Sequence, residues 1–194
     1  MSNHSTKTRD RILQATWQLL ESRQGNGGRM SDIAKEAGVS RQALYLHFET
    51  RSDLLVAATL YLDEVKGIEE RLAPSRAAPD GITRLTAFID AWANYIPEIY
   101  GVARALMILQ ETDKAAAEAW SGRMLAVRHG CAAAIHALER DRQLSPTYSA
   151  EQATDMLWML LSVRSWEQLT QTSKWTQSEY VSHIQRLAKN AFVQ

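Results

Sequence analysis

The feature that most constrains this chain is the stretch over residues 29–55, which reads RMSDIAKEAGVSRQALYLHFETRSDLL. It predicts two short helices joined by a tight turn. Gly38 stands where the first helix, expected over residues 30–37, has to end in a left-handed residue, a conformation that glycine adopts without steric cost. Ser40 then offers a hydroxyl that can cap the next helix.

A capping box follows these two helices. Thr50 and Asp53 have the spacing at which each side chain accepts from the other residue's backbone amide, so a third helix is expected to begin at Arg51. Helix, short turn with glycine, helix is the helix-turn-helix arrangement, whose second helix enters the major groove of DNA. The sequence therefore predicts a DNA-binding domain near its start.

The same stretch carries a resemblance to a known family. The matching residues are Asp32-Ile33-Ala34, Ala37-Gly38-Val39-Ser40, Leu44-Tyr45, His47-Phe48, Arg51 and Leu54-Leu55. Over residues 7–56 this pattern closely resembles the DNA-binding domain of the TetR family. The resemblance implies an all-α protein of about nine helices. It would have a three-helix helix-turn-helix DNA-binding domain over residues 1–52 and a helical ligand-binding and dimerisation domain over 53–194.

Composition is compatible with such a protein. The chain has 194 residues, 45% hydrophobic and 23% charged, which is ordinary for a globular protein. The net charge is zero, but the first 56 residues hold eight Lys or Arg against six Asp or Glu. No apolar run could span a bilayer, no signal peptide is apparent, and the single Cys131 excludes an internal disulfide. We therefore expect a cytoplasmic protein, with Cys131 as a small buried hydrophobe.

The predicted recognition helix presents a polar face. Arg41 can donate twice to guanine, Gln42 can pair bidentately with adenine, and Ala43 can touch a thymine methyl group. A solvated helix face is the alternative, which the helix-turn-helix context disfavours. By resemblance, Tyr45 and His47 donate to phosphates. The residues expected to contact DNA are Lys7, Arg29, Met30, Ser40, Arg41, Gln42, Ala43, Tyr45, His47 and Arg51.

Two of these residues differ from the usual pattern of the resembling family. Arg51 stands where family members usually have a phosphate-binding lysine. Arg29 stands near the position where they often carry Thr or Ser, and we expect its longer side chain to reach a phosphate instead.

Helical periodicity and capping signals predict the remaining elements. Residues 1–5 are expected to be disordered, residues 7–22 to form a helix and residues 22–28 a glycine-rich loop. Further helices are expected over 51–72, 80–96, 97–109, 115–140, 150–172 and 177–192, with a linker at 73–81. Capping boxes at Ser149–Gln152 and Thr176–Glu179 begin the last two.

The helix expected over residues 150–172 is apolar on nearly all sides, so it has to be buried on both faces. A partner subunit is one explanation, and a central position in the chain is the other. In the resembling family the last two helices pair with their copies in a four-helix bundle. The residues expected at the dimer interface are Met156, Leu157, Leu160, Leu161, Tyr180, Ile184, Leu187 and Ala188.

Aromatic and Met residues are frequent after residue 56. Most are expected in the core, yet a cavity lined by such side chains can hold a flat or flexible apolar ligand. The resemblance implies an inducer pocket in this part of the chain. The residues expected to line it are Tyr61, Trp92, Tyr95, Tyr100, Met107, Trp120, Met124 and Trp158.

No catalytic constellation, metal site or cofactor is predicted. The histidines lack ligand spacing, and His129 and His136, seven residues apart, are separated by about two helical turns. The sequence thus predicts a non-enzymatic regulator, most simply a repressor that binds a palindromic operator in double-stranded DNA as a homodimer. A small apolar or aromatic effector would release it. A ligand-independent or activating regulator is the alternative, and a helical enzyme acting on an apolar substrate is a remote one.

Overall fold

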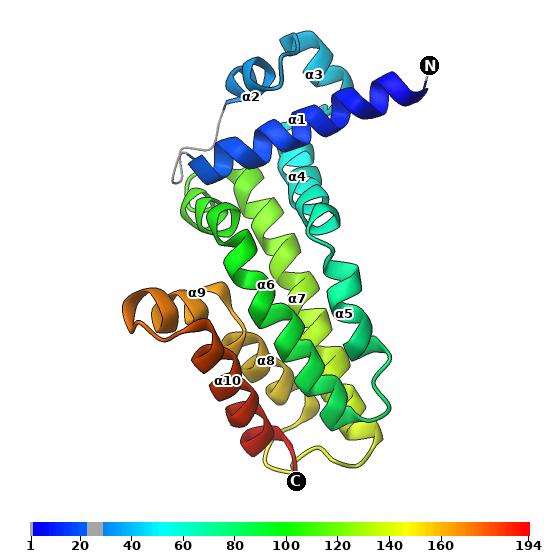
Figure 1. The fold of residues 1–194 in the computed structure, drawn as a ribbon, viewed down its shortest axis with the longest axis vertical. Helices are drawn as coiled ribbons and strands as arrows, with labels where there is room; N and C mark the ends of the chain where they lie inside the picture. The colour runs from blue at the N-terminus through cyan, green and yellow to red at the C-terminus, as the bar shows by residue number, and fades with distance from the viewer. Residues whose placement is uncertain (1, 23–28) are drawn as a thin grey trace. The chain divides into compact units, whose positions relative to one another are not determined.

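The computed structural model describes residues 2–22 and 29–194 (Figure 1). These residues form helices and connecting turns without a β-strand, which confirms the predicted all-α class. The first five helices are α1 (Ser2–Ser22), α2 (Met30–Glu36), α3 (Arg41–His47), α4 (Arg51–Val65) and α5 (Ile68–Arg76). They are followed by α6 (Gly81–Leu109), α7 (Lys114–Arg140), α8 (Ala150–Leu160), α9 (Val163–Trp166), the π-helix η1 (Glu167–Thr172) and α10 (Gln177–Phe192).

The start of the chain differs from the prediction. Helix α1 begins at Ser2, so disorder over residues 2–5 was wrong. Each residue added to an existing helix gains a backbone hydrogen bond, which favours extension of α1 toward its N-terminus. Of the glycine-rich loop expected at 22–28, only Ser22 is among the described residues.

Contacts divide the chain into two compact units. The first comprises Met1–Lys66 and Ile99–Arg123, and the second comprises Gly67–Glu98 and Met124–Gln194. Helices α6 and α7 therefore each contribute to both units. Residues 99–123 group here with helices α1–α4, and the functional division expected after residue 52 stays a prediction.

The core of the first unit lies among its N-terminal helices. Helix α1 packs against α2 and α4, and α2 packs against α3 (Figure 1). The buried cluster consists of Ile12, Leu13, Ala15, Leu19, Met30, Ile33, Ala34, Ala37, Leu44, Phe48, Leu54 and Ala58. Packing of these side chains holds α2 and α3 against α1 and α4.

The single helix predicted over 51–72 was wrong. Helix α4 ends at Val65, and Gly67 has a φ of +66°, so the chain turns through a left-handed residue before α5. Helix α5 then continues to Arg76, with Pro74 inside it, and the linker predicted at 73–81 is correspondingly shorter.

The helix boundary predicted at Pro97 was also wrong. Helix α6 runs through this residue without interruption. Proline has no amide hydrogen, so it cannot donate to the carbonyl four residues earlier, that of Ala93. The side-chain amide of Gln177 on α10 donates to this oxygen at 2.9 Å. A contact from a distant helix thus replaces the missing backbone bond.

The last predicted helices were correct in part. The capping boxes at Ser149 and Thr176 begin α8 and α10 as expected. The helix over 150–172 is not continuous, however, because α8 ends at Leu160 and Ser162 caps a new segment, α9 with η1. Tertiary hydrogen bonds to the carbonyls of Leu160 and Leu161 hold this interruption.

Cys131 is fully buried on α7, as expected. Burial raises the pKa of its thiol to about 12, so the thiolate that reacts with oxidants or alkylating agents does not form near neutral pH. The part of the chain that the structure describes contains no helix whose length and hydropathy would suit a membrane span.

Candidate nucleic-acid interface

The turn of the helix-turn-helix forms as the sequence predicts. Gly38 has a φ of +62°, and the Val39 amide donates to the Ala34 carbonyl at 2.9 Å, which closes the end of α2. A further contact was not predicted from the sequence: the Arg11 guanidinium on α1 donates to the carbonyls of Ala37 at 2.5 Å and Gly38 at 3.2 Å. Helix α1 therefore anchors the turn.

Helix α3 begins at the predicted cap. The Ser40 hydroxyl accepts from the Ala43 amide at 3.1 Å. Leu44 and Phe48 are buried and attach α3 to the core, with the Arg9 guanidinium 5.2 Å from the centre of the Phe48 ring. The capping box of Thr50 then begins α4 at Arg51, as expected.

The outer face of α3 carries most of the predicted base contacts. Arg41, Gln42 and Tyr45 are exposed. The Arg41 guanidinium lies 5.6 Å from the centre of the Tyr45 ring, a cation–π contact that orders both side chains. Ser40 is also exposed, whereas Ala43 and His47 are half-buried.

Leu46 lies on this outer face and was absent from the predicted contacts. Its side chain is 83% exposed. Leu44 and Phe48 both face the core, so Leu46, halfway between them on a helix, has to point away from it. The exposure of Leu46 could therefore have been predicted from its spacing to these two core residues. A single exposed leucine is ordinary on a protein surface, so it is the position of Leu46 on the outer face of α3 that makes it a candidate contact.

The other predicted contacts have different environments. Lys7 and Arg29 are exposed, and Arg29 begins α2 with its backbone amide 3.4 Å from the Asp32 carboxylate. Met30 is only 8% exposed and belongs to the core cluster, so its side chain is largely unavailable to DNA. It was expected to contact DNA, but tertiary packing covers its apolar side chain.

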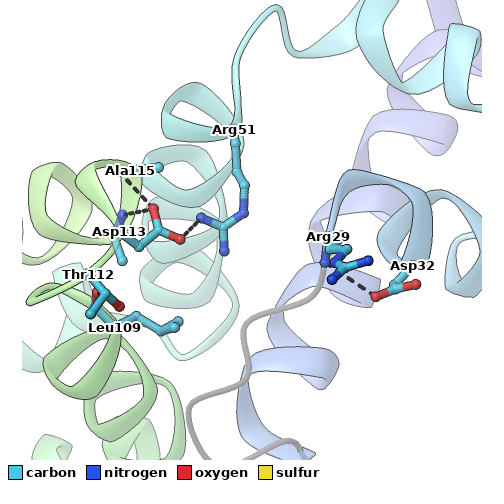
Figure 2. A network of polar contacts seen from close by, with 8 residues as sticks. Arg29, Asp32, Arg51, Leu109, Thr112, Asp113 and Ala115 are labelled. Carbon is cyan, nitrogen blue, oxygen red and sulfur yellow. Dashed lines mark hydrogen bonds and ion pairs between the residues drawn. The ribbon is translucent and has the colours of Figure 1, made fainter.

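Arg51 is half-buried and already has a charged partner. Its guanidinium donates to the carboxylate of Asp113, which immediately precedes α7, and the two side chains are 21% and 26% exposed (Figure 2). The other carboxylate oxygen of Asp113 accepts from the amides of Ala115 at 3.0 Å and Ala116 at 3.3 Å. Asp113 therefore caps α7 and pairs with Arg51 at once.

These residues border an open groove of about 640 Å³ in the first unit. Its lining is Arg29, Met30, Ser31, Arg41, Tyr45, Arg51, Asp113 and Ala115. Three arginines with a single carboxylate make this lining positively charged, which suits a phosphate backbone. Within the described residues, no group of three metal-ligating side chains occurs.

The predicted dimer residues are mostly internal to the chain. Leu157, Leu161, Tyr180, Ile184 and Ala188 are buried within it, and burial raises the pKa of the Tyr180 hydroxyl. Met156 and Leu160 are half-buried, and Leu187 is 50% exposed. The sequence pattern did not distinguish a helix buried by its own chain from one buried by a partner.

The predicted pocket residues are shared between the units. Tyr61, Tyr100, Met107 and Trp120 belong to the first unit, and Trp92, Tyr95, Met124 and Trp158 belong to the second. Trp92 is buried and its indole donates to the Leu161 carbonyl at 2.8 Å, which is a structural role. The indole nitrogen of Trp158 is buried without a hydrogen-bond partner among the described residues.

Comparison with known proteins gives a family match at the same place. Residues 12–58 match the model of bacterial regulatory proteins of the tetR family. Over 64 residues the chain is 38% identical to the nucleoid occlusion factor SlmA of Marinomonas sp. (strain MWYL1), an alignment covering 33% of this chain and 32% of SlmA. The chain thus matches only about a third of that relative's length.

Solved structures share the fold over nearly the whole chain. A TetR transcription regulator from Haloarcula marismortui superposes with a TM-score of 0.71 at 20% identity, covering 97% of this chain and 100% of that one. NalD, the secondary repressor of the MexAB-OprM multidrug efflux pump in Pseudomonas aeruginosa, gives 0.70 at 22% identity, covering 99% and 98%. Residues 12–58 thus match a DNA-binding domain of the tetR family, and the solved structures show that the chain around it has the same fold.

Proposed function

We propose that this protein is a transcriptional regulator that binds double-stranded DNA through α3, as a homodimer acting on a palindromic operator in the cytoplasm. Members of the family are DNA-binding transcription factors rather than enzymes. The observation that carries the proposal is the outer face of α3, where Arg41, Gln42, Tyr45 and Leu46 are all exposed on a helix fixed by the buried Leu44.

The exposed residues of α3 can contact different parts of the DNA. Arg41 and Gln42 have side chains that pair bidentately with guanine and adenine. Tyr45 and the groove arginines serve the phosphates. Leu46 extends further from the core than the half-buried Ala43, so we assign the contact with a thymine methyl group to Leu46 instead.

Dimerisation would give the operator its symmetry. Two recognition helices about 34 Å apart read half-sites in successive major grooves. Met159 and Leu187 leave 56% and 50% of their surface exposed on α8 and α10, so we place the partner there rather than on the internal residues of the predicted set. Burying such side chains supplies the apolar area that a stable dimer needs.

We further propose that a small effector releases the DNA. The NalD likeness supports the sign of regulation, since NalD is a repressor. The Trp158 indole supports an effector with a hydrogen-bond acceptor, because a buried donor left unpaired costs free energy that a bound acceptor would recover. The effector has to bind the released state more tightly than the DNA-bound state.

The test is a selection of random duplex DNA by the purified protein at two salt concentrations. We expect an enriched palindrome with half-sites about one helical turn apart, and binding that weakens as salt rises. The enriched duplex then serves as the probe in a screen of apolar and aromatic compounds.

Two controls separate the alternatives. The variant Arg41→Ala should lose operator binding while its sedimentation still gives a dimer. Salt-sensitive binding without a motif would contradict an operator-specific regulator. Operator binding that no compound alters would favour the ligand-independent alternative, and turnover of a screened compound would favour the enzyme.

A further inference from the structure

The partner of Arg51 has a consequence for DNA affinity. Arg51 begins α4 beside the recognition helix and borders the groove that also contains Arg29 and Arg41. A phosphate in this groove is the natural ligand of its guanidinium. In the structure, however, the guanidinium is paired with the carboxylate of Asp113 (Figure 2).

We propose that Asp113 competes with DNA phosphate for Arg51, so that the start of α7 limits the affinity of the operator site. This inference rests on the proposed function, because it concerns regulation of the same DNA-binding surface. In the free protein Asp113 neutralises Arg51, and in the DNA complex a phosphate takes the place of the carboxylate.

Asp113 is held too firmly to leave the site by a simple side-chain rotation. One of its oxygens caps α7 through the amides of Ala115 and Ala116, and its own backbone amide donates to Leu109 at the end of α6 at 2.9 Å. The carboxylate therefore keeps its place at the groove. Exchange has to come from Arg51 or from a shift of α4 away from α7.

A second ion pair opposes a shift of α4 away from α7. Asp63, near the end of α4, pairs with Arg123 on α7 at 2.7 Å, and both side chains are largely buried. Helix α4 is thus attached to the same part of the chain at both ends, at Arg51 and at Asp63. The Asp63–Arg123 pair holds α4 and α7 together, while the Arg51–Asp113 pair borders the groove.

The charge balance at the groove gives the sign of the effect. A phosphate that approaches Arg51 also approaches the negative charge of Asp113, and each like-charge contact opposes binding. Removing that charge should strengthen binding, whereas removing a residue that orients Arg51 for phosphate would weaken it. The change in DNA affinity therefore distinguishes a residue that competes for Arg51 from one that orients it.

The test is the variant Asp113→Asn, in which the asparagine still caps α7 because it accepts from the same amides. We expect it to bind the selected operator about fivefold more tightly per half-site at low salt, the factor for one like charge removed at contact distance in water. The slope of log K against log salt should steepen by about 1 per subunit, because each subunit then presents one more uncompensated positive charge to the phosphates. Thermal unfolding of the variant checks that the fold is kept.

Two further variants make the result specific. Glu111→Gln removes the same charge from an exposed residue two positions earlier and should leave affinity nearly unchanged. In the background Arg51→Ala, Asp113→Asn should lose its effect, because a competitor acts only through the residue for which it competes.

The outcomes are separable from those of the proposed function. If wild type selects an operator but Asp113→Asn binds it equally or more weakly, the proposal that Asp113 competes for Arg51 is wrong. The proposed function as a DNA-binding regulator is then unaffected. An equal gain from Glu111→Gln, or a gain that persists without Arg51, would also overturn it. If wild type selects no DNA, the proposed function fails and this inference fails with it.

Discussion

Two places in the chain interrupt one helix and begin another with a serine cap. At the helix-turn-helix, Ser40 accepts from the amide three residues later at 3.1 Å. Between α8 and α9, Ser162 does the same at 3.1 Å. The caps are equivalent, but the residues before them are not.

The first interruption is built into the local sequence. Gly38 takes the left-handed conformation that ends α2, and no other part of the chain is needed to explain why the helix stops there. Arg11 from α1 strengthens a turn that already has this shape.

The second interruption has neither glycine nor proline, and distant side chains hold it. The carbonyls freed at the end of α8 accept from the Trp92 indole at Leu161 and from the Tyr180 hydroxyl, 3.2 Å away, at Leu160. The Ser165 hydroxyl donates to Met159 at 2.7 Å. A helix can therefore end without glycine or proline when side chains from other helices donate to its last carbonyls.

The largest expected effect comes from removing such a partner. Trp92→Ala deletes a buried indole and leaves the Leu161 carbonyl unpaired, so unfolding free energy should fall by about 3–5 kcal/mol. Trp92→Phe keeps most of the volume and should cost about 1–2 kcal/mol. Urea denaturation of both variants measures this. A Trp92→Phe variant as stable as wild type would show that the indole bond does not hold the break.

At the local interruption the decisive change is Gly38→Ala. A side chain at φ +62° is strained, and an added Cβ would lie 2.9 Å from the Arg11 guanidinium, so we expect a loss of about 1–2 kcal/mol. Gly122 in α7 is the matched control, since an added Cβ there meets open space and alanine should stabilise by about 0.5–1 kcal/mol. Losses of similar size at both glycines would contradict this account of the turn.

The two caps should respond alike. Ser40→Ala and Ser162→Ala each remove one side-chain acceptor from a helix start and should each cost about 1 kcal/mol in urea denaturation. Only Ser40→Ala should also weaken operator binding, because it disturbs the start of α3. A much smaller loss at Ser162 would mean that tertiary contacts alone maintain the second interruption.

The smallest effect on stability is expected at Leu46. Because its side chain is 83% exposed, Leu46→Ala should change unfolding free energy by less than about 0.5 kcal/mol. It should still weaken operator binding by about 1 kcal/mol through loss of apolar contact. Replacing the operator's thymines with uracil, which lacks the methyl group, should weaken wild type but not Leu46→Ala. If Ala43→Gly abolishes the uracil effect instead, Ala43 makes the contact.

The sequence determined those parts whose causes lie within a few residues. Gly38, Ser40 and the Thr50 capping box specify the helix-turn-helix locally, so its helices, its turn and most of its exposed face followed from the pattern. Leu46 was within reach of the same reasoning, since its spacing from Leu44 and Phe48 fixes its direction.

Tertiary structure decided the rest because the causes lie far apart in the chain. Arg51 meets Asp113 across 62 residues, Trp92 reaches Leu161 across 69, and Gln177 reaches Ala93 across 84. Periodicity and capping signals report on one or two helical turns, so they carry no information about such pairs. The break after α8, the passage of α6 through Pro97 and the partner of Arg51 therefore emerge only when the chain is folded.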